Sequence, residues 1–235
     1  MANLSILHLF PNTLRLNGEV GNVMALSQRA KSSGFKVSIS NYEVFESTPK
    51  VRPDIVFIGS GTLQSTLVAL KDLSRIDRHL HQWVEQGTKI LAVGSGFDLV
   101  SQGLILADGT NIPGLGMTNT THRITDSYRV GEVVVSADLA GFINSDREVI
   151  RGDESLALGI VTASDEKNLV GYIDGYCDGK VWASNIQGPF LPMNPKFADE
   201  ILVAVASTYK KSTESRALDK LSSKAREAIS IRVGN

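Results

Sequence analysis

The stretch Lys89-Ile90-Leu91-Ala92-Val93-Gly94-Ser95-Gly96-Phe97 decides how the rest of the chain is interpreted. Its first five residues form a strand-like run, apolar from Ile90 to Val93 and typical of a buried parallel strand, and Phe97 begins a short apolar helix. A buried strand, a tight turn and a helix make the place where α/β enzymes present a nucleophile above their sheet. Glycines at positions 94 and 96 let the backbone turn sharply. The position of the nucleophile is Gly94, which has no side chain.

A second turn, Asn185-Ile186-Gln187-Gly188-Pro189, follows the strand-like run 180–184. A catalytic base would be expected there, but the residue is Gln187, whose carboxamide takes no proton near neutral pH. The two turns therefore predict the architecture of an α/β enzyme without its two reactive groups.

Composition limits the class of protein. The 235 residues are 42% hydrophobic and 21% charged, which is ordinary globular composition with enough length for a real core. The net charge of −1, with no run of Lys or Arg longer than two, argues against a nucleic-acid binder. We find no apolar run of membrane-spanning length and no signal peptide. The single cysteine, Cys177, excludes an intrachain disulfide, and we expect a cytoplasmic protein.

The order of the patterns predicts the fold class. Apolar runs at 4–10, 54–58 and 89–93 alternate with helical spacing at 17–33 and 67–86, the latter with a kink or break near Ile76. This order is α/β, with a mostly parallel central sheet and helices on both faces. Glycine turns end two of the apolar strands, at the edge where open α/β sheets bind ligands.

The second half is predicted to be β-rich. Short strand patterns between residues 104 and 184 are separated by strong turn signals such as Asp174-Gly175 and Asp178-Gly179. We assign residues 1–211 to a single domain. Residues 212–235 form a polar C-terminal tail with apolar residues at roughly helical intervals, an arm or a partner-binding helix.

With both turns placed, the chain resembles class I glutamine amidotransferases of the cobyric-acid-synthase type. Within that family it is most similar to the glutaminase subunits of lipid II isoglutaminyl synthase, which work with a Mur-ligase-like partner in peptidoglycan precursor amidation. The resemblance extends over about residues 4–210, in the family's order. Its residues are Ile6–Leu9, Gly21–Val23, Ala25-Leu26, Gln28–Ala30, Asp54–Gly61, Gly114–Gly116 and Gly188–Asn194.

The resemblance implies a cysteine nucleophile at Gly94 and a histidine base at Gln187. The chemistry needs a thiolate to attack the glutamine carboxamide and a base to activate it. Neither residue can supply its group, so we predict a disabled glutaminase site, and restoring it would need both groups at once. Cys177 lies in a turn-rich segment away from the elbow.

Ligand-binding candidates surround these positions. Ser95 is a weak catalytic candidate, and its amide occupies the family's oxyanion-donor position. Gly59-Ser60-Gly61 would supply further backbone donors. The resemblance places a carboxylate-binding arginine near Arg129, and Arg123 could take the same role. We therefore predict that the site could bind a small carboxylate or anion, and expect no metal and no cofactor.

We interpret the chain as a glutamine-amidotransferase-like protein with a disabled site, a binding or regulatory subunit that could still pair with a Mur-ligase-like protein. One alternative is an active glutaminase, or a hydrolase that uses Ser95 or another nucleophile. Another is a glutaminase whose missing groups come from a partner chain. The alternatives differ in whether a hydroxyl or thiol lies within about 3.2 Å of an imidazole at the strand edge.

Overall fold

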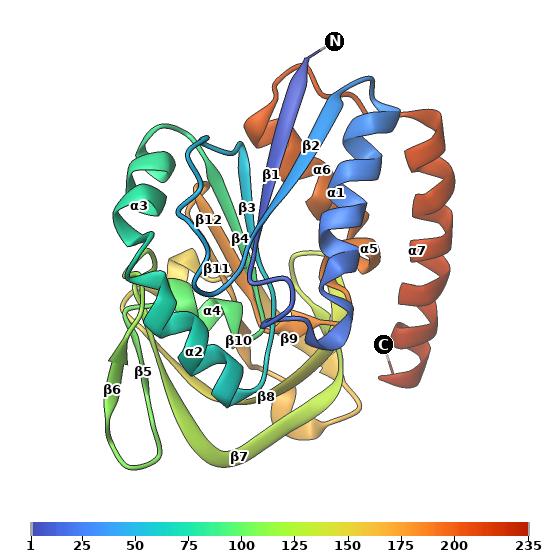
Figure 1. The fold of residues 1–235 in the computed structure, drawn as a ribbon. Coiled ribbons are helices and arrows are strands. Elements are labelled where there is room, and N and C mark those ends of the chain that lie inside the picture. Colours follow the sequence, from blue (N-terminus) through green and yellow to red (C-terminus); the bar gives the residue numbers. More distant parts are fainter. Residues whose placement is uncertain (1, 235) are drawn as a thin grey trace.

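The computed structural model describes residues 2–234 and their side chains, apart from the side chain at position 155. The fold contains two β-sheets, and most of the helices pack around the first one (Figure 1). Met1 and Asn235, the outer ends of the predicted domain and tail, lie outside the described residues.

The central sheet has six strands in the order β11-β12-β4-β3-β1-β2. All neighbours pair in parallel except β11, which is antiparallel to β12. The strands are β1 (Asn3–Leu9), β2 (Lys36–Tyr42), β3 (Ile55–Ile58), β4 (Lys89–Val93), β11 (Tyr176–Cys177) and β12 (Val181–Ser184).

Helices cover both faces of this sheet. Along β3, Ile55 and Phe57 belong to one hydrophobic cluster with side chains of α1 and α6, while Val56 and Ile58 belong to the other with α2, α3 and α4. This burial on both faces explains the continuous apolar strands of the sequence. The helices are α1 (Val20–Ser32), α2 (Leu63–Leu73), α3 (Asp77–Glu85), α4 (Gly96–Val100) and α6 (Pro195–Val205). The gap between α2 and α3 lies where a break was predicted.

The second sheet contains a long antiparallel hairpin of β7 (Thr120–Val135) and β8 (Leu139–Arg151). Its register shifts between Ile124 and Arg129, so residues 125–128 bulge outward. The other strands are β5 (Gly103–Ile105), β6 (Asn111–Pro113), β9 (Gly159–Ser164), β10 (Ile173–Asp174) and β13 (Ile186–Gln187). Because β13 pairs with β8, the hairpin lies against the turn that carries Gln187.

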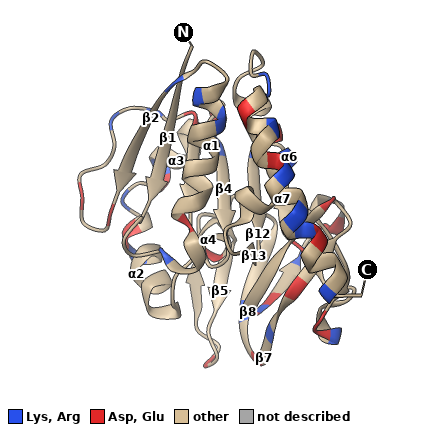
Figure 2. Ribbon diagram, turned by 90° about the vertical axis from the view of Figure 1, so that its right-hand side faces the viewer, with Lys and Arg blue, Asp and Glu red and all other residues tan. Residues whose placement is uncertain are grey.

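The tail is a helix, α7 (Thr213–Arg232), which packs beside α1 and α5 (Phe190–Met193) and against the β7/β8 hairpin (Figure 1). Basic and acidic residues are distributed along α7 (Figure 2). Arg29 of α1 holds Asp219 of α7 at 2.8 Å, and Ile229 is buried. Short 3₁₀ turns occur at Leu16–Gly18, Glu154–Leu156 and Lys167–Leu169.

These features confirm the predicted fold class, a mostly parallel sheet with helices on both faces and a β-rich second half. Within residues 2–234, no helix has both the length and the apolar character to cross a membrane. The same residues contain no cluster of three or more His, Cys, Asp or Glu side chains arranged to hold a metal ion.

Candidate functional site

The two predicted positions lie side by side at the C-terminal ends of neighbouring parallel strands. Gly94 follows β4, and Gln187 lies just beyond the adjacent strand β12. Gly94 has a φ of +58°, the left-handed conformation of a sharp elbow, and its amide donates to the Ser184 carbonyl at 2.8 Å. An ideal Cβ placed on Gly94 would stand 3.0 Å from the Gln187 Cδ. The sequence positions expected to react with each other are therefore neighbours in space.

The volume that a side chain at position 94 would need is already filled. An ideal Cβ on Gly94 would lie 2.6 Å from the Oγ and 2.7 Å from the Cβ of Ser60. Both distances are shorter than real Cβ contacts, so a residue larger than glycine requires Ser60 or its turn to move. Ser60 is itself buried at the end of β3, which leaves it little room to do so.

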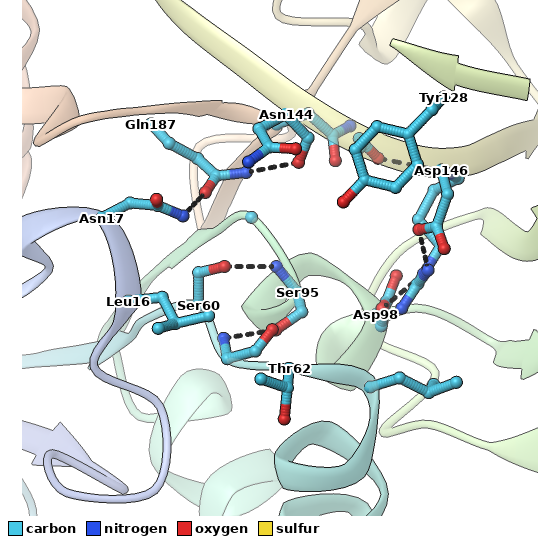
Figure 3. A pocket seen from close by; sticks show the side chains of 16 residues that line it. Leu16, Asn17, Ser60, Thr62, Ser95, Asp98, Tyr128, Asn144, Asp146 and Gln187 are labelled. Carbon is cyan, nitrogen blue, oxygen red and sulfur yellow. Dashed lines mark hydrogen bonds and ion pairs between the residues drawn. The ribbon is translucent and has the colours of Figure 1, made fainter. Parts of the chain in front are cut away.

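Serine hydroxyl oxygens accept hydrogen bonds from the backbone amides around this elbow (Figure 3). The Gly61 amide donates to the Ser95 Oγ at 2.9 Å, and the Ser95 amide points to the Ser60 Oγ at 3.4 Å. The Ser95 hydroxyl also lies 3.4 Å from the Gly61 carbonyl. In the described part of the chain, Ser95 thus contacts the backbone of Gly61 and the hydroxyl of Ser60 rather than an imidazole.

Gln187 is held as a carboxamide on both of its ends (Figure 3). Its Oε1 accepts a hydrogen bond from the Asn17 side chain, and its Nε2 donates to the Asn144 carbonyl at 3.2 Å. The side chain is buried. A carboxamide offers one acceptor and one donor group, so these two contacts match Gln187 and fix its orientation.

A cavity of about 300 Å³ opens above the elbow. Most of its lining residues are of polar types, and the charged ones are Asp98, Asp146 and Arg147. Tyr128, from the bulge in β7, projects over one side (Figure 3). The full lining is Leu16, Asn17, Ser60–Leu63, Gly94, Ser95, Asp98, Tyr128, Asn144–Arg147, Asn185 and Gln187.

Behind the cavity, an aspartate, a histidine and a hydroxyl form a buried chain. Asp98 contacts the His122 Nδ1 at 2.6 Å, and the His122 Nε2 lies 3.2 Å from the Thr120 Oγ1. This is the hydroxyl–imidazole distance that a hydrolase would need. However, His122 and Thr120 are fully buried, neither lines the cavity, and the Thr120 hydroxyl also bonds Thr118 at 2.8 Å. This hydroxyl is therefore not accessible from the cavity, and the burial of the Asp98–His122–Thr120 series is typical of a structural network.

The arginine at the cavity is Arg147, not either predicted arginine. Arg123 lies outside, paired with Glu148 at 2.9 Å, and both side chains are 47% exposed. Arg129 donates to the Arg147 carbonyl at 2.9 Å and lies 5.3 Å from the ring centre of Tyr172. Neither lines the cavity. The guanidinium of Arg147 donates its Nε to Asp98 at 2.9 Å and contacts Asp146.

Two buried titratable groups lie near the edge of the central sheet at which its parallel strands end. Burial raises the pKa of Glu19 to about 8. The Ser60 amide and the Asn22 side chain donate hydrogen bonds to the carboxylate, which lower the pKa by less than burial raises it. Asn22 in turn accepts from the Leu191 amide at 2.7 Å, so Glu19 and Asn22 connect the Ser60 turn to the segment after Gln187. Burial lowers the pKa of His8 to about 4, and His8 packs edge-on against Phe57.

Cys177 lies in β11, at the edge of the central sheet, and is half-buried. It does not line the cavity, and burial raises the pKa of its thiol. A raised pKa keeps a thiol protonated and weakly nucleophilic. Cys177 is thus outside the candidate site, as its sequence position indicated.

Sequence reasoning missed Asn17, Asp98, Tyr128, Asn144, Asp146 and Arg147 as cavity residues. Four of them belong to the β7/β8 hairpin, whose length and bulge the short strand patterns did not reveal. The five consecutive polar residues 144–148 of β8 are the signal that could have indicated a polar, solvent-accessible stretch of this strand.

Two curated proteins similar to this chain carry the same description. The chain is 29% identical over 206 residues, 86% of its length and 84% of the relative's, to the lipid II isoglutaminyl synthase (glutamine-hydrolyzing) subunit GatD of Staphylococcus aureus (strain N315). It is 25% identical over 201 residues, 83% of its length and 77% of the relative's, to the GatD subunit of Streptococcus pneumoniae (strain ATCC BAA-255 / R6).

Among solved structures, one match is a crystal structure of a glutamine amidotransferase, at 15% identity and a TM-score of 0.45, covering 85% of this chain and 98% of that one. A family model of the CobB/CobQ-like glutamine amidotransferase domain matches residues 6–195. That span includes both glycine turns and the Gln187 turn, and on this match the chain belongs to the CobB/CobQ-like glutamine amidotransferase family.

Proposed function

We propose that this chain is a glutamine-amidotransferase-like subunit in lipid II amidation that does not itself hydrolyse glutamine. The two curated relatives are subunits of a glutamine-hydrolysing lipid II isoglutaminyl synthase, and this supports a role in lipid II amidation. In this role the chain is a cytoplasmic binding or regulatory subunit, paired with a Mur-ligase-like protein.

One observation carries the loss of hydrolysis. Position 94 is a glycine, and the space beside its Cα is taken by the Ser60 side chain. The group facing it is the Gln187 carboxamide, already bonded at both ends. Attack on the glutamine carboxamide needs a nucleophile and a base in contact, and this pair offers neither.

The position of Ser95 supports this proposal over a serine hydrolase. Its hydroxyl is bonded to the Gly61 turn at 2.9 Å, and the imidazole of His122 is buried behind Asp98. The neighbouring amides are bonded to serine hydroxyls instead of remaining open for an oxyanion.

The test is a glutaminase assay of the purified chain, alone and with the Mur-ligase-like protein of the same organism. The GatD subunit of S. aureus, assayed with its own partner, is the positive control. We expect no ammonia above the buffer blank in either condition. Turnover by the chain alone that is lost in Ser95→Ala would instead establish the serine hydrolase, and turnover only with the partner would establish a shared site.

A further inference from the structure

We propose that the cavity above Gly94 binds its ligand through a primary ammonium group, with the Asp146 carboxylate and the Asn144 side-chain oxygen as acceptors. This rests on the proposed function, because it treats the cavity as a site of binding without turnover. It also reverses the ligand charge that the sequence led us to expect.

The first observation behind this proposal is the balance of charges among the residues that line the cavity. Two carboxylates, Asp98 and Asp146, face one guanidinium, Arg147, and these are the only charged side chains among the described lining residues. Arg147 contacts both carboxylates, so its charge is already balanced within the wall. Its side chain is 9% exposed, whereas that of Asp146 is 31% exposed. Of this ion pair, the Asp146 carboxylate is therefore the member more accessible to a ligand.

The hydrogen-bond inventory points the same way. The amides of Gly61 and Ser95, which an anion would use, are bonded to serine hydroxyls. Asn144 lines the cavity, and its Oδ1 is buried and has no hydrogen-bond partner within the described residues. Buried acceptors are normally bonded, so a ligand that fits this wall supplies N–H donors.

Tyr128 adds a third contact. The residue is 65% exposed, unusual for an aromatic one, and the bulge at residues 125–128 holds its ring over the cavity (Figure 3). The face of an aromatic ring attracts a cation. A volume of about 300 Å³ is at the small end of ligand sites, which suits an amine of amino-acid size.

Three matched probes separate the possible ligand chemistries: propylammonium chloride, sodium propionate and propionamide, titrated at constant ionic strength. Binding is followed by NMR through the side-chain amide signals of Asn144 and Gln187. We expect propylammonium to bind most tightly and propionate least. Tighter binding of propionate or of propionamide than of propylammonium would overturn the proposal.

Two substitutions test the assigned acceptors. Asp146→Asn should weaken propylammonium binding by about tenfold, the usual scale for a charged hydrogen bond, and should raise the affinity for propionate because it frees Arg147. Asn144→Asp should tighten propylammonium binding, a gain that misfolding cannot produce. The control is Asp126→Asn, which makes the same charge change on the exposed bulge, outside the lining.

An Asp126→Asn effect as large as that of Asp146→Asn would mean that overall charge sets the preference, and would overturn the proposal. So would an unchanged affinity in Asn144→Asp. Neither result bears on glutamine hydrolysis, because the ammonia assay measures turnover and none of these probes is a glutaminase substrate. Failure of the ammonium site and failure of the proposed function are thus separate outcomes.

Discussion

The side chain of Ser60 stands where a side chain on Gly94 would have to be: its Oγ lies 2.6 Å from the ideal Cβ position at residue 94. The two residues lie in the turns that follow neighbouring parallel strands, β3 (Ile55–Ile58) and β4 (Lys89–Val93). A residue larger than glycine at position 94 therefore fits only if Ser60 or its turn moves. Glycine at position 94 thus matches the packing of this edge of the sheet.

The first prediction concerns the stability of the elbow. Gly94→Ala should lower the free energy of unfolding by about 1–2 kcal/mol for the left-handed backbone and by about 1–3 kcal/mol more for the overlap with Ser60. Urea denaturation at equilibrium measures both together. Gly109→Ala is the matched control, because Gly109 has a φ of +85° and open space around its Cα.

The difference between the stability losses of Gly94→Ala and Gly109→Ala isolates the cost of the overlap with Ser60. Adding Ser60→Gly to Gly94→Ala should remove most of that difference. Equal losses in Gly94→Ala and Gly109→Ala would show that the Ser60 turn yields without cost.

A second prediction is that restoring glutaminase chemistry takes three substitutions. The sequence indicated two, Gly94→Cys and Gln187→His, but the side chain introduced by Gly94→Cys would still collide with Ser60. Ser60→Gly is the third, since alanine would keep the Cβ that lies 2.7 Å from the new one. Groups that act as a unit give strongly non-additive effects, so we expect activity only in the triple variant.

The measurement is covalent trapping of the introduced thiol by a glutamine-like electrophile, detected by mass spectrometry. The Ser60→Gly/Gly94→Cys variant, without the histidine, serves as the control for a thiol that lacks a base. Equal labelling of the triple variant and the Gly94→Cys/Gln187→His variant would contradict the role assigned to Ser60.

The parallel core could be predicted because its signal is local. The strand 89–93 and the strand 54–58 are continuous apolar runs, as burial on both faces requires, and each ends in a glycine turn. Neighbouring parallel strands bring those turns to one edge whatever the loops do. The proximity of Gly94 and Gln187 was implied by the family resemblance, and in the structure they follow the neighbouring parallel strands β4 and β12.

The cavity wall could not be predicted in the same way, because it depends on strand register. Arg147 pairs with Ile124 across the hairpin, and the shift after Ile124 decides which face each arginine takes. A one-residue change of register moves a side chain to the opposite face. Arg123 and Arg129 were therefore as plausible in the sequence as Arg147. The contact of Asp98 with His122 also joins two distant elements, α4 and β7.

A third prediction concerns Asp98, whose two oxygens hold His122 and Arg147 at 2.6 and 2.9 Å. Removing one partner of a buried ion pair leaves the other charge without compensation. Asp98→Ala should therefore lower the free energy of unfolding by about 3–5 kcal/mol. Glu148→Ala, which removes the exposed partner of Arg123, should cost at most about 1 kcal/mol. Thermal or urea unfolding of the two variants under one buffer makes the comparison, and similar losses would argue against a supporting role for the buried chain.

The last prediction is a dependence of stability on pH that comes from Glu19. Its pKa is raised from 4.5 to about 8 in the folded state, so the folded chain binds a proton that the unfolded chain has released. Stability from this group is full below the unfolded pKa and is lost as pH rises toward the folded one. Between about pH 7 and about pH 9 the loss should be about 1.4 kcal/mol. His8 does not interfere, because its lowered pKa, about 4, places its titration at more acidic pH.

Glu19→Gln keeps the shape of the side chain and cannot ionise, so its stability should stay level over that range while the wild-type chain becomes less stable. Urea unfolding at several pH values gives both curves. Glu148→Gln is the control, since Glu148 is exposed on the hairpin and should leave the wild-type slope unchanged. A Glu19→Gln curve parallel to that of the wild type would mean that Glu19 is already ionised in the fold. The Ser60 amide would then be bonded to a permanent charge, and the link from Glu19 through Asn22 to Leu191 would be independent of pH.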